Sequence, residues 1–359
     1  LGMINSRYPS RYFPDGSFAK RYDKEGKAMP QLFLNTYGSG GLYSAPADMA
    51  KIAMMMIGKG KLGGVRILSE ESVAAMGVDQ TVESFNPVRA NGSRYGLGWD
   101  TVHQPGLGAV DIVGWQKRGD VPLYGAVMTI APSEKLAVIV LGASGSFSSA
   151  AATKIAERIL LRALAEKGRI ASMPAPLKLA PRPEKTPPDR LLDSVSGYYA
   201  NNSSFLRVKR QAGSLHISRY DAGKNGWQDW LTGLKLRNDD RFANDADPSR
   251  LVSFKTAEGR QYIVFRSVGG YGQYQDDLIF GQQVAAAGKL PDSWNGRLGK
   301  KWLLVNEHPD FLDKWGTPVM QLRAVDNFLI AYWGEPQVVD PLFSDSRAGM
   351  MLLIPQAMG

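Results

Sequence analysis

Apolar residues recur at helical spacing in three stretches of the first half of the chain. Three helices are therefore predicted, over residues 46–57, 70–76 and 148–166. Ser44 is the candidate N-cap of the first helix and Ser69 that of the second, whose first turn also carries two acids. Gly168 follows the third helix as its candidate C-cap.

Between the second and third helices the pattern changes to short β-rich runs separated by turn residues. Strands are predicted over residues 95–99, 109–115, 123–131 and 136–141. Pro132, Ser133 and Glu134 lie between the last two runs and predict a hairpin turn. The order of helices, strands and a closing helix predicts an α+β fold, with an antiparallel sheet flanked by helices.

A proline-rich segment divides the chain. Six prolines fall within residues 173–189, and they exclude both a continuing helix and a central strand. Beyond it, short alternating runs are broken by Gly, Asn and Asp about every ten residues, a spacing typical of an all-β barrel or sandwich. Such runs cover residues 205–210, 214–218, 251–255, 262–268 and 302–306. The predicted domains are 1–168 and 191–359, with a linker over 169–190.

Composition narrows the classes of function. The 359 residues are 44% apolar, enough for a sizeable core, and no apolar run approaches the roughly 20 residues of a membrane-spanning helix. The net charge of +9 comes from scattered Lys and Arg, so no nucleic-acid partner is expected. The absence of cysteine excludes disulfides and thiol chemistry, and the three histidines lack metal-ligand spacing. No metal and no cofactor is expected.

One polar run interrupts the predicted sheet. Lys117, Arg118, Gly119 and Asp120 precede the 123–131 strand, where a buried strand would carry apolar side chains. The run is either a solvated strand end or one wall of an active site.

Three segments share their order and spacing with a known family. They are GSGGLYSAPADMAKIAMMMIGKGKLGGVRILSEESVAAM (38–76), YGLGWD (95–100) and KRGDVPLYGAVMTIAP (117–132). Together they resemble the C-terminal half of the catalytic domain of penicillin-recognising serine hydrolases, a family that includes class C β-lactamases, D-Ala-D-Ala carboxypeptidases, D-aminopeptidases and esterases. The resemblance covers about residues 1–168. The second domain resembles, more weakly, the lipocalin-like barrels appended to some members.

The resemblance implies roles for the polar run. Lys117 and Gly119 match the family's Lys-x-Gly element, in which the cation attracts a substrate carboxylate and glycine lets an acyl peptide lie along the strand. The backbone N–H of Asp120 would donate in an oxyanion hole, and its carboxylate would add negative charge nearby. Arg118 stands where Ser or Thr is common; it and Tyr124 are the candidate contacts to a small-molecule or peptide substrate.

The family's nucleophile is a Ser-x-x-Lys pair on a helix. Ser17 and Lys20 have this spacing, but they follow Asp15-Gly16 in a polar, turn-rich stretch. Tyr199 and Asn201 spell the family's Tyr-x-Asn, but they lie beyond the linker. Both matches are rejected. The true motifs are then expected upstream of Leu1, in a missing N-terminal part of a larger enzyme, which the resemblance would place in the periplasm or outside the cell. The alternative is a catalytically silent relative that binds a peptide or a cell-wall fragment.

Tryptophans gather in the second half. Trp227, Trp230, Trp294, Trp302, Trp315 and Trp333 lie there, out of eight in the chain. They either form the core of the β domain or, together with the glycine-rich loop 269–272, reach over the catalytic cleft as a lid that limits substrate size.

Overall fold

The structure is a computed structural model of the whole chain. It describes residues 1–9, 13–14, 16–31, 38, 40–81, 86–121, 123–201, 203–285, 292–303, 319–332, 336–340 and 350–351.

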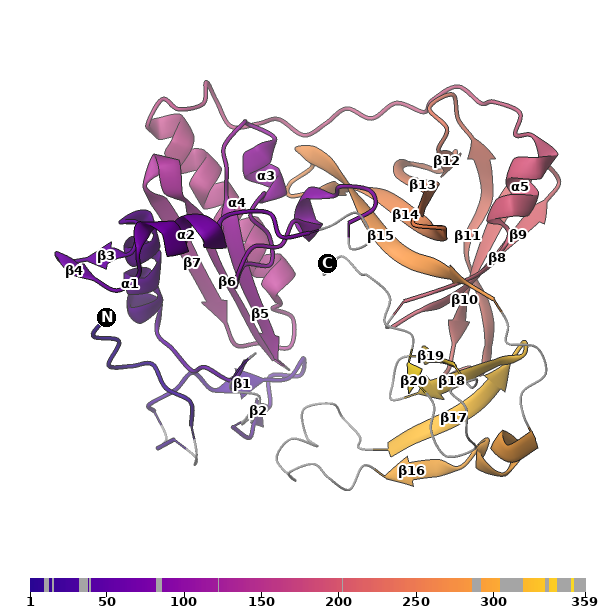
Figure 1. The fold of residues 1–359 in the computed structure, drawn as a ribbon, viewed down its shortest axis with the longest axis horizontal. Helices are drawn as coiled ribbons and strands as arrows, with labels where there is room; N and C mark the ends of the chain where they lie inside the picture. Colours follow the sequence, from indigo (N-terminus) through magenta and orange to yellow (C-terminus); the bar gives the residue numbers. More distant parts are fainter. Residues whose placement is uncertain are drawn as a thin grey trace.

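An antiparallel sheet flanked by helices forms the first half, as predicted (Figure 1). Its strands, in spatial order, are β5 (Trp115–Val121), β6 (Tyr124–Ala131) and β7 (Leu136–Gly142). Helix α1 (Pro46–Ile57) packs its apolar stripe on Met128 and Ile130 of one face. Helix α4 (Ser149–Glu166) packs Ala152 and Ala156 on Val127 of the other face. The turn η2 (Pro132–Glu134) joins β6 to β7, which confirms the predicted hairpin.

Smaller elements surround this sheet. They are β1 (Arg21–Tyr22), β2 (Ala28–Met29), β3 (Lys61–Leu62), β4 (Val65–Arg66), α2 (Glu70–Met76), the 3₁₀ turn η1 (Asn91–Ser93) and α3 (Pro105–Gly108).

The predicted helix ends are confirmed at two helices and wrong at one. Ser69 caps α2 by accepting from the Ser72 N–H at 3.0 Å. Gly168, at φ +67°, ends α4, where its N–H bonds Ala165 O at 2.9 Å. At α1, however, Ala45 is the residue at the N-cap and Ser44 is not, because the Ser44 hydroxyl lies 2.7 Å from that of Ser6 instead.

Two predicted strands do not form. Residues 95–99 make a tight turn closed by the Gly96–Trp99 bridge, and Gly98 in that turn has φ +81°. Residues 109–111 form a turn after α3, where Asp111 adopts φ +60°, and residues 112–114 have no regular structure. Only Trp115 of the predicted 109–115 strand lies in β5, so the Lys-Arg-Gly-Asp run is itself the body of that strand.

After α4 the chain runs without helix or strand over residues 173–188, apart from one bridge between Glu184 and Arg237. Helix α5 (Asp189–Val195) then leads into a closed antiparallel barrel of eight strands. The strands are β8 (Gly197–Ala200), β9 (Phe205–Gln211), β10 (Ser214–Asp221), β11 (Gly226–Leu236), β12 (Phe242–Asn244), β13 (Asp247–Ala257), β14 (Arg260–Gly269) and β15 (Tyr274–Val284). The predicted barrel is confirmed.

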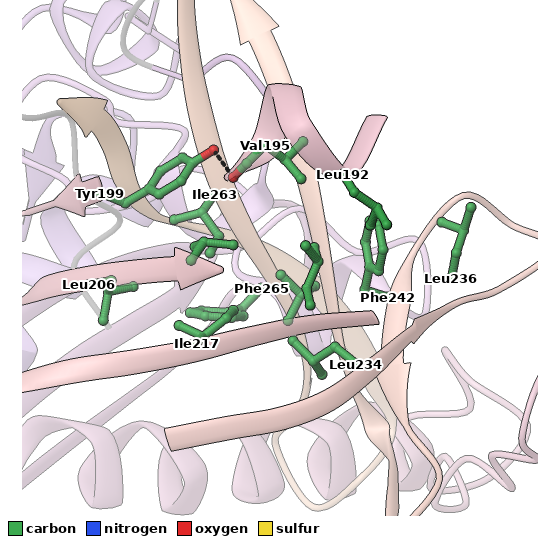
Figure 2. Packing of buried hydrophobic residues seen from close by; sticks show 13 residues of the cluster. Leu192, Val195, Tyr199, Leu206, Ile217, Leu234, Leu236, Phe242, Ile263 and Phe265 are labelled. Carbon is green, nitrogen blue, oxygen red and sulfur yellow. Dashed lines mark hydrogen bonds between the residues drawn. The ribbon is translucent and has the colours of Figure 1, made fainter. Parts of the chain in front are cut away.

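Buried side chains fill the barrel. Leu206, Ile217, Leu234 and Ile263 meet inside it, and the hydroxyl of buried Tyr199 donates to Val195 O at 3.0 Å (Figure 2). This interior is a packed core of the kind that eight-stranded barrels form.

A second sheet follows the barrel. The 3₁₀ turn η3 (Asp292–Arg297) precedes β16 (Lys301–Leu303), β17 (Val319–Val325), β18 (Phe328–Tyr332), β19 (Pro336–Asp340) and β20 (Met350–Met351). Phe328 and Ile330 pack against Phe205 of the barrel.

The described tryptophans of this half mostly pack in cores. Trp227 and Trp230 pack against barrel clusters and Trp294 is buried beside the second sheet, while Trp302 is 39% exposed. Trp315 and Trp333 lie outside the described residues. No helix in the described part of the chain is long and apolar enough to cross a bilayer.

Candidate active site

Strand β5 is one of the two outer strands of its sheet and, in Figure 1, the one nearest the barrel. Lys117 pairs with Met128 and Gly119 with Ala126, so both face the α1 side. Arg118 and Asp120 alternate with them and face the α4 side. The sequence-predicted run is therefore split between two faces of the sheet.

Asp100 holds Lys117 in place, and sequence reasoning missed it. Its carboxylate accepts from Lys117 Nζ at 2.7 Å and from the backbone N–H of Arg118 at 2.6 Å. The Asp100 side chain is 11% exposed, whereas that of Lys117 is 47% exposed. The ammonium group of Lys117 is therefore held by a nearly buried carboxylate and is still accessible to a ligand. The signal was present, because Asp100 ends the YGLGWD segment that carried the resemblance.

The outer edge of β5 is partly used by the chain itself. Gln116 exchanges backbone hydrogen bonds with Thr101, at 2.8 and 3.3 Å. Since the N–H groups of an antiparallel strand alternate between its two edges, those of Gln116, Arg118 and Asp120 all point outward. The Asp120 N–H thus points to the side on which a substrate carbonyl can approach.

Gly119 leaves space above the strand. A Cβ placed there would have only Ala126 Cβ within 4 Å, at 3.9 Å. Glycine at this position is not required by packing within the described structure, which fits the expectation that its surface serves a ligand.

The Asp120 carboxylate points away from the Asp120 N–H and binds the start of α4. It accepts from Ser149 N–H at 2.7 Å and also from the Ser149 hydroxyl. The carboxylate therefore stabilises the positive end of the α4 dipole, and its expected contribution of negative charge near an oxyanion hole stays a prediction.

Arg118 and Tyr124 occupy different surroundings. The Arg118 guanidinium Nε lies 4.0 Å from Asp100 Oδ2, on the α4 side of the sheet. Tyr124 pairs with Val121 on the Lys117 face, and its hydroxyl donates to Ala19 O at 2.5 Å. Burial raises the pKa of Tyr124, which keeps the phenol neutral. Of the two, Tyr124 is the one that shares a face with Lys117 and Gly119.

The two rejected motifs lie as expected. Ser17 is in a turn, where its hydroxyl donates to Pro14 O at 2.7 Å. Tyr199 is buried in the barrel core, where burial raises its pKa, and Asn201 Nδ2 donates to Phe280 O at 2.6 Å. Neither pair therefore lies on a helix that could carry the family's nucleophile.

The glycine-rich loop does not cover β5. Tyr271 stacks under the Arg158 guanidinium of α4 at 5.0 Å, and Gly272 O accepts from the Leu177 N–H at 2.7 Å. Helix α4 covers the face opposite Lys117, and the loop contacts α4 and the linker; that it reaches over the catalytic cleft stays a prediction. Within the described ranges no cluster of His, Asp and Glu is placed to hold a metal ion.

The Beta-lactamase family model matches residues 1–162. No curated protein matches the chain. Among solved structures, the octameric penicillin-binding protein homologue from Pyrococcus abyssi is similar, with 20% identity and a TM-score of 0.37, over 77% of this chain and 57% of that one.

Two structures of another protein are also similar. The crystal structure of SurE has 19% identity and a TM-score of 0.46, over 77% of this chain and 57% of that one. SurE with D-Leu has 20% identity and a TM-score of 0.41, over 68% of this chain and 51% of that one. The present chain thus spans little more than half the length of each of these structures.

Proposed function

We propose that this chain supplies one wall of the active site of a serine hydrolase, and the match of residues 1–162 to the Beta-lactamase family model supports the proposal. The reaction is attack on an amide or ester carbonyl by a serine, through an acyl-enzyme that water then hydrolyses. The observation that carries the proposal is the anchored but open Lys117, beside an outward-pointing Asp120 N–H on the outer strand of the sheet.

Each group has a role in the proposed reaction. Serine attack turns the carbonyl into a tetrahedral oxyanion, to which the Asp120 N–H donates; one such donor is worth about 3 kcal/mol in comparable sites. Lys117 draws a substrate carboxylate and favours the deprotonated serine, while Asp100 fixes its position. Because Gly119 has no side chain, the acyl group can lie along β5.

The proposed substrates are β-lactams, peptides of D-amino acids and simple esters. The acylated serine is assigned to a Ser-x-x-Lys helix other than Ser17–Lys20, because a nucleophile needs its base within hydrogen-bond reach on a rigid element. Ser17 instead sits in an exposed turn.

The position of Ser17 in a turn also favours a second candidate function. The sequence contains no other Ser-x-x-Lys, so the chain itself fits a catalytically silent relative that binds a peptide or cell-wall fragment on the same strand. The two candidates differ in whether a covalent adduct forms.

The full-length protein should be incubated with a fluorophosphonate and with a fluorescent penicillin, digested, and analysed by mass spectrometry. If the protein is the proposed hydrolase, we expect one labelled serine with a lysine three positions after it. A protein that takes no label from either probe but retains a peptide fragment contradicts the hydrolase and supports the silent binder.

A further inference from the structure

The barrel reaches the first half of the chain through the hairpin of β14 and β15 (Figure 1). At its contact with η1, the Asp276 carboxylate accepts from the backbone N–H groups of Gly92 at 3.0 Å and Asn91 at 3.3 Å. These bonds join residues 184 and 185 positions apart in the sequence. An acidic side chain of one domain thus accepts from the backbone N–H groups at the start of a turn of the other domain.

The same turn is tied to the segment beside β5. The hydroxyl of Thr101 donates to Asn91 O at 2.7 Å, and the Val102 N–H donates to Arg94 O at 2.9 Å. Thr101 is 3% exposed, so an unpaired hydroxyl there would be costly. The position of η1 therefore constrains the position of Thr101.

Thr101 and its neighbour Asp100 are in turn bonded to the strand. Thr101 O accepts from the Gln116 N–H at 2.8 Å, and the Asp100 N–H donates to Gln116 O at 2.9 Å. The Asp100 carboxylate then holds Lys117 and the Arg118 N–H. An unbroken series of hydrogen bonds leads from the barrel to the candidate catalytic lysine.

We propose that Asp276 of the barrel is a positioning residue for β5: by fixing η1 it sets Thr101 and Asp100, and through them the place of Lys117. Its importance for catalysis rests on the proposed function, whereas its effect on β5 does not. The barrel is then a part of the site's framework, acting from the side and without contact with substrate.

Amide hydrogen exchange tests the coupling without any substrate. In Asp276→Ala, peptides covering 100–104 and 115–119 should exchange about tenfold faster, the factor expected when a hydrogen bond to a charged acceptor is lost. Asp276→Asn retains one acceptor oxygen and should restore part of the protection, which also covers the case in which the alanine variant folds poorly. Unchanged exchange in β5 in both variants overturns the proposal.

Asp277→Ala is the matched control. Asp277 is the next carboxylate along β15, but it pairs with Arg266 inside the barrel at 2.7 Å through both oxygens. Its loss should speed exchange in the barrel peptide around residue 266 and leave 115–119 unchanged. Equal acceleration of β5 by both variants would mean that any damage to the barrel loosens the strand, and would contradict a specific role for Asp276.

Ester hydrolysis by the full-length protein tests the catalytic part. In the wild-type background, Asp276→Ala should lower kcat/KM. In the Lys117→Ala background the same change should leave kcat/KM as it is, because both substitutions act through Lys117. A loss that is the same in both backgrounds contradicts action through Lys117. Faster exchange of β5 with unchanged kcat/KM would confirm the coupling and contradict the proposed role of β5 as a wall of the active site.

Discussion

The main chain and the side chain of Asp120 point in different directions and have separable roles. The N–H faces the open edge of β5, while the carboxylate binds Ser149 at the start of α4. Asp120→Ala should therefore lower the free energy of unfolding by about 1 kcal/mol, the usual cost of a lost helix cap. Hydrolysis by the full-length protein should remain, because the N–H is retained.

Denaturant unfolding and ester hydrolysis measure the two effects on the same preparation. Asp120→Asn, which keeps an acceptor oxygen, should lose less stability than the alanine variant. A collapse of activity with unchanged stability would show that the carboxylate, and not the N–H, serves the site.

At Ser17 the expected result is the absence of chemistry. Its hydroxyl is exposed and donates to Pro14 O in a turn, and not on a rigid helix that could hold a base in place. The 359-residue chain incubated with a fluorophosphonate should give no adduct at Ser17, as measured by the intact mass and the tryptic map. Stoichiometric labelling there would contradict the assignment of the nucleophile to another helix.

Among the elements, the β14–β15 hairpin meets α4 at Gly270. Gly270 has φ +60°, and a Cβ there would lie 2.2 Å from Glu157 Oε1. Gly259, at the tip of the β13–β14 turn, has φ +72° but nothing within 4 Å of a Cβ. Alanine at either costs about 1 kcal/mol of backbone strain, but only at Gly270 does it also push the hairpin off α4.

The rate of trypsin cleavage in the linker measures whether the β14–β15 hairpin moves away from α4, because the Leu177 N–H is bonded to Gly272 O of the same hairpin. Cleavage after Lys178 should be faster in Gly270→Ala and unchanged in Gly259→Ala. Equal rates in the two variants would mean that the close contact with Glu157 does not hold the hairpin in place.

Elements with a local cause were predictable from the sequence. Helix α2 begins at Ser69 because that side chain caps it, and α4 ends at Gly168 because only a left-handed residue closes it there. The failures have tertiary causes. Residues 95–99 have strand-like composition, but Trp99 is buried against Trp115, with ring centroids 5.7 Å apart, and the segment folds into a turn.

The candidate site was predictable only in part. Alternation along a strand could separate Lys117 and Gly119 from Arg118 and Asp120, once β5 was known to begin at Trp115. The pairing of Asp100 with Lys117 spans 17 positions, and no periodicity reports a contact of that kind. The bond from Asp276 to η1 crosses two domains, so only the folded chain reveals it.

On the scale of the whole molecule, the buried interface between the two halves should respond to pH. Burial raises the pKa of Glu157 above 4.5, against the hydrogen bond from Gln104, and burial likewise raises the pKa of Asp276. The folded state therefore holds these protons more tightly than the unfolded chain does. The free energy of unfolding should fall as pH rises from about 4.5 through the raised pKa of Glu157.

Thermal unfolding measured across this range checks the sign. Glu157→Gln keeps the shape without the ionisable group, so its unfolding temperature should fall less steeply with pH, and the variant should exceed the wild-type protein at neutral pH. An identical pH dependence in the two proteins would show that Glu157 does not titrate at the interface.

The most direct test of the central claim, that β5 forms one wall of a serine hydrolase site, is the rate of acylation of the full-length protein by an ester or penicillin probe. Lys117→Ala should slow acylation by about 100-fold or more, the equivalent of a few kcal/mol at the transition state, while the unfolding temperature stays within a few degrees. Lys235→Ala, which breaks a surface pair between barrel strand β11 and Glu184 of the linker, should acylate at the wild-type rate. Equal acylation rates for the wild-type and Lys117→Ala proteins would remove β5 from the site and contradict the account.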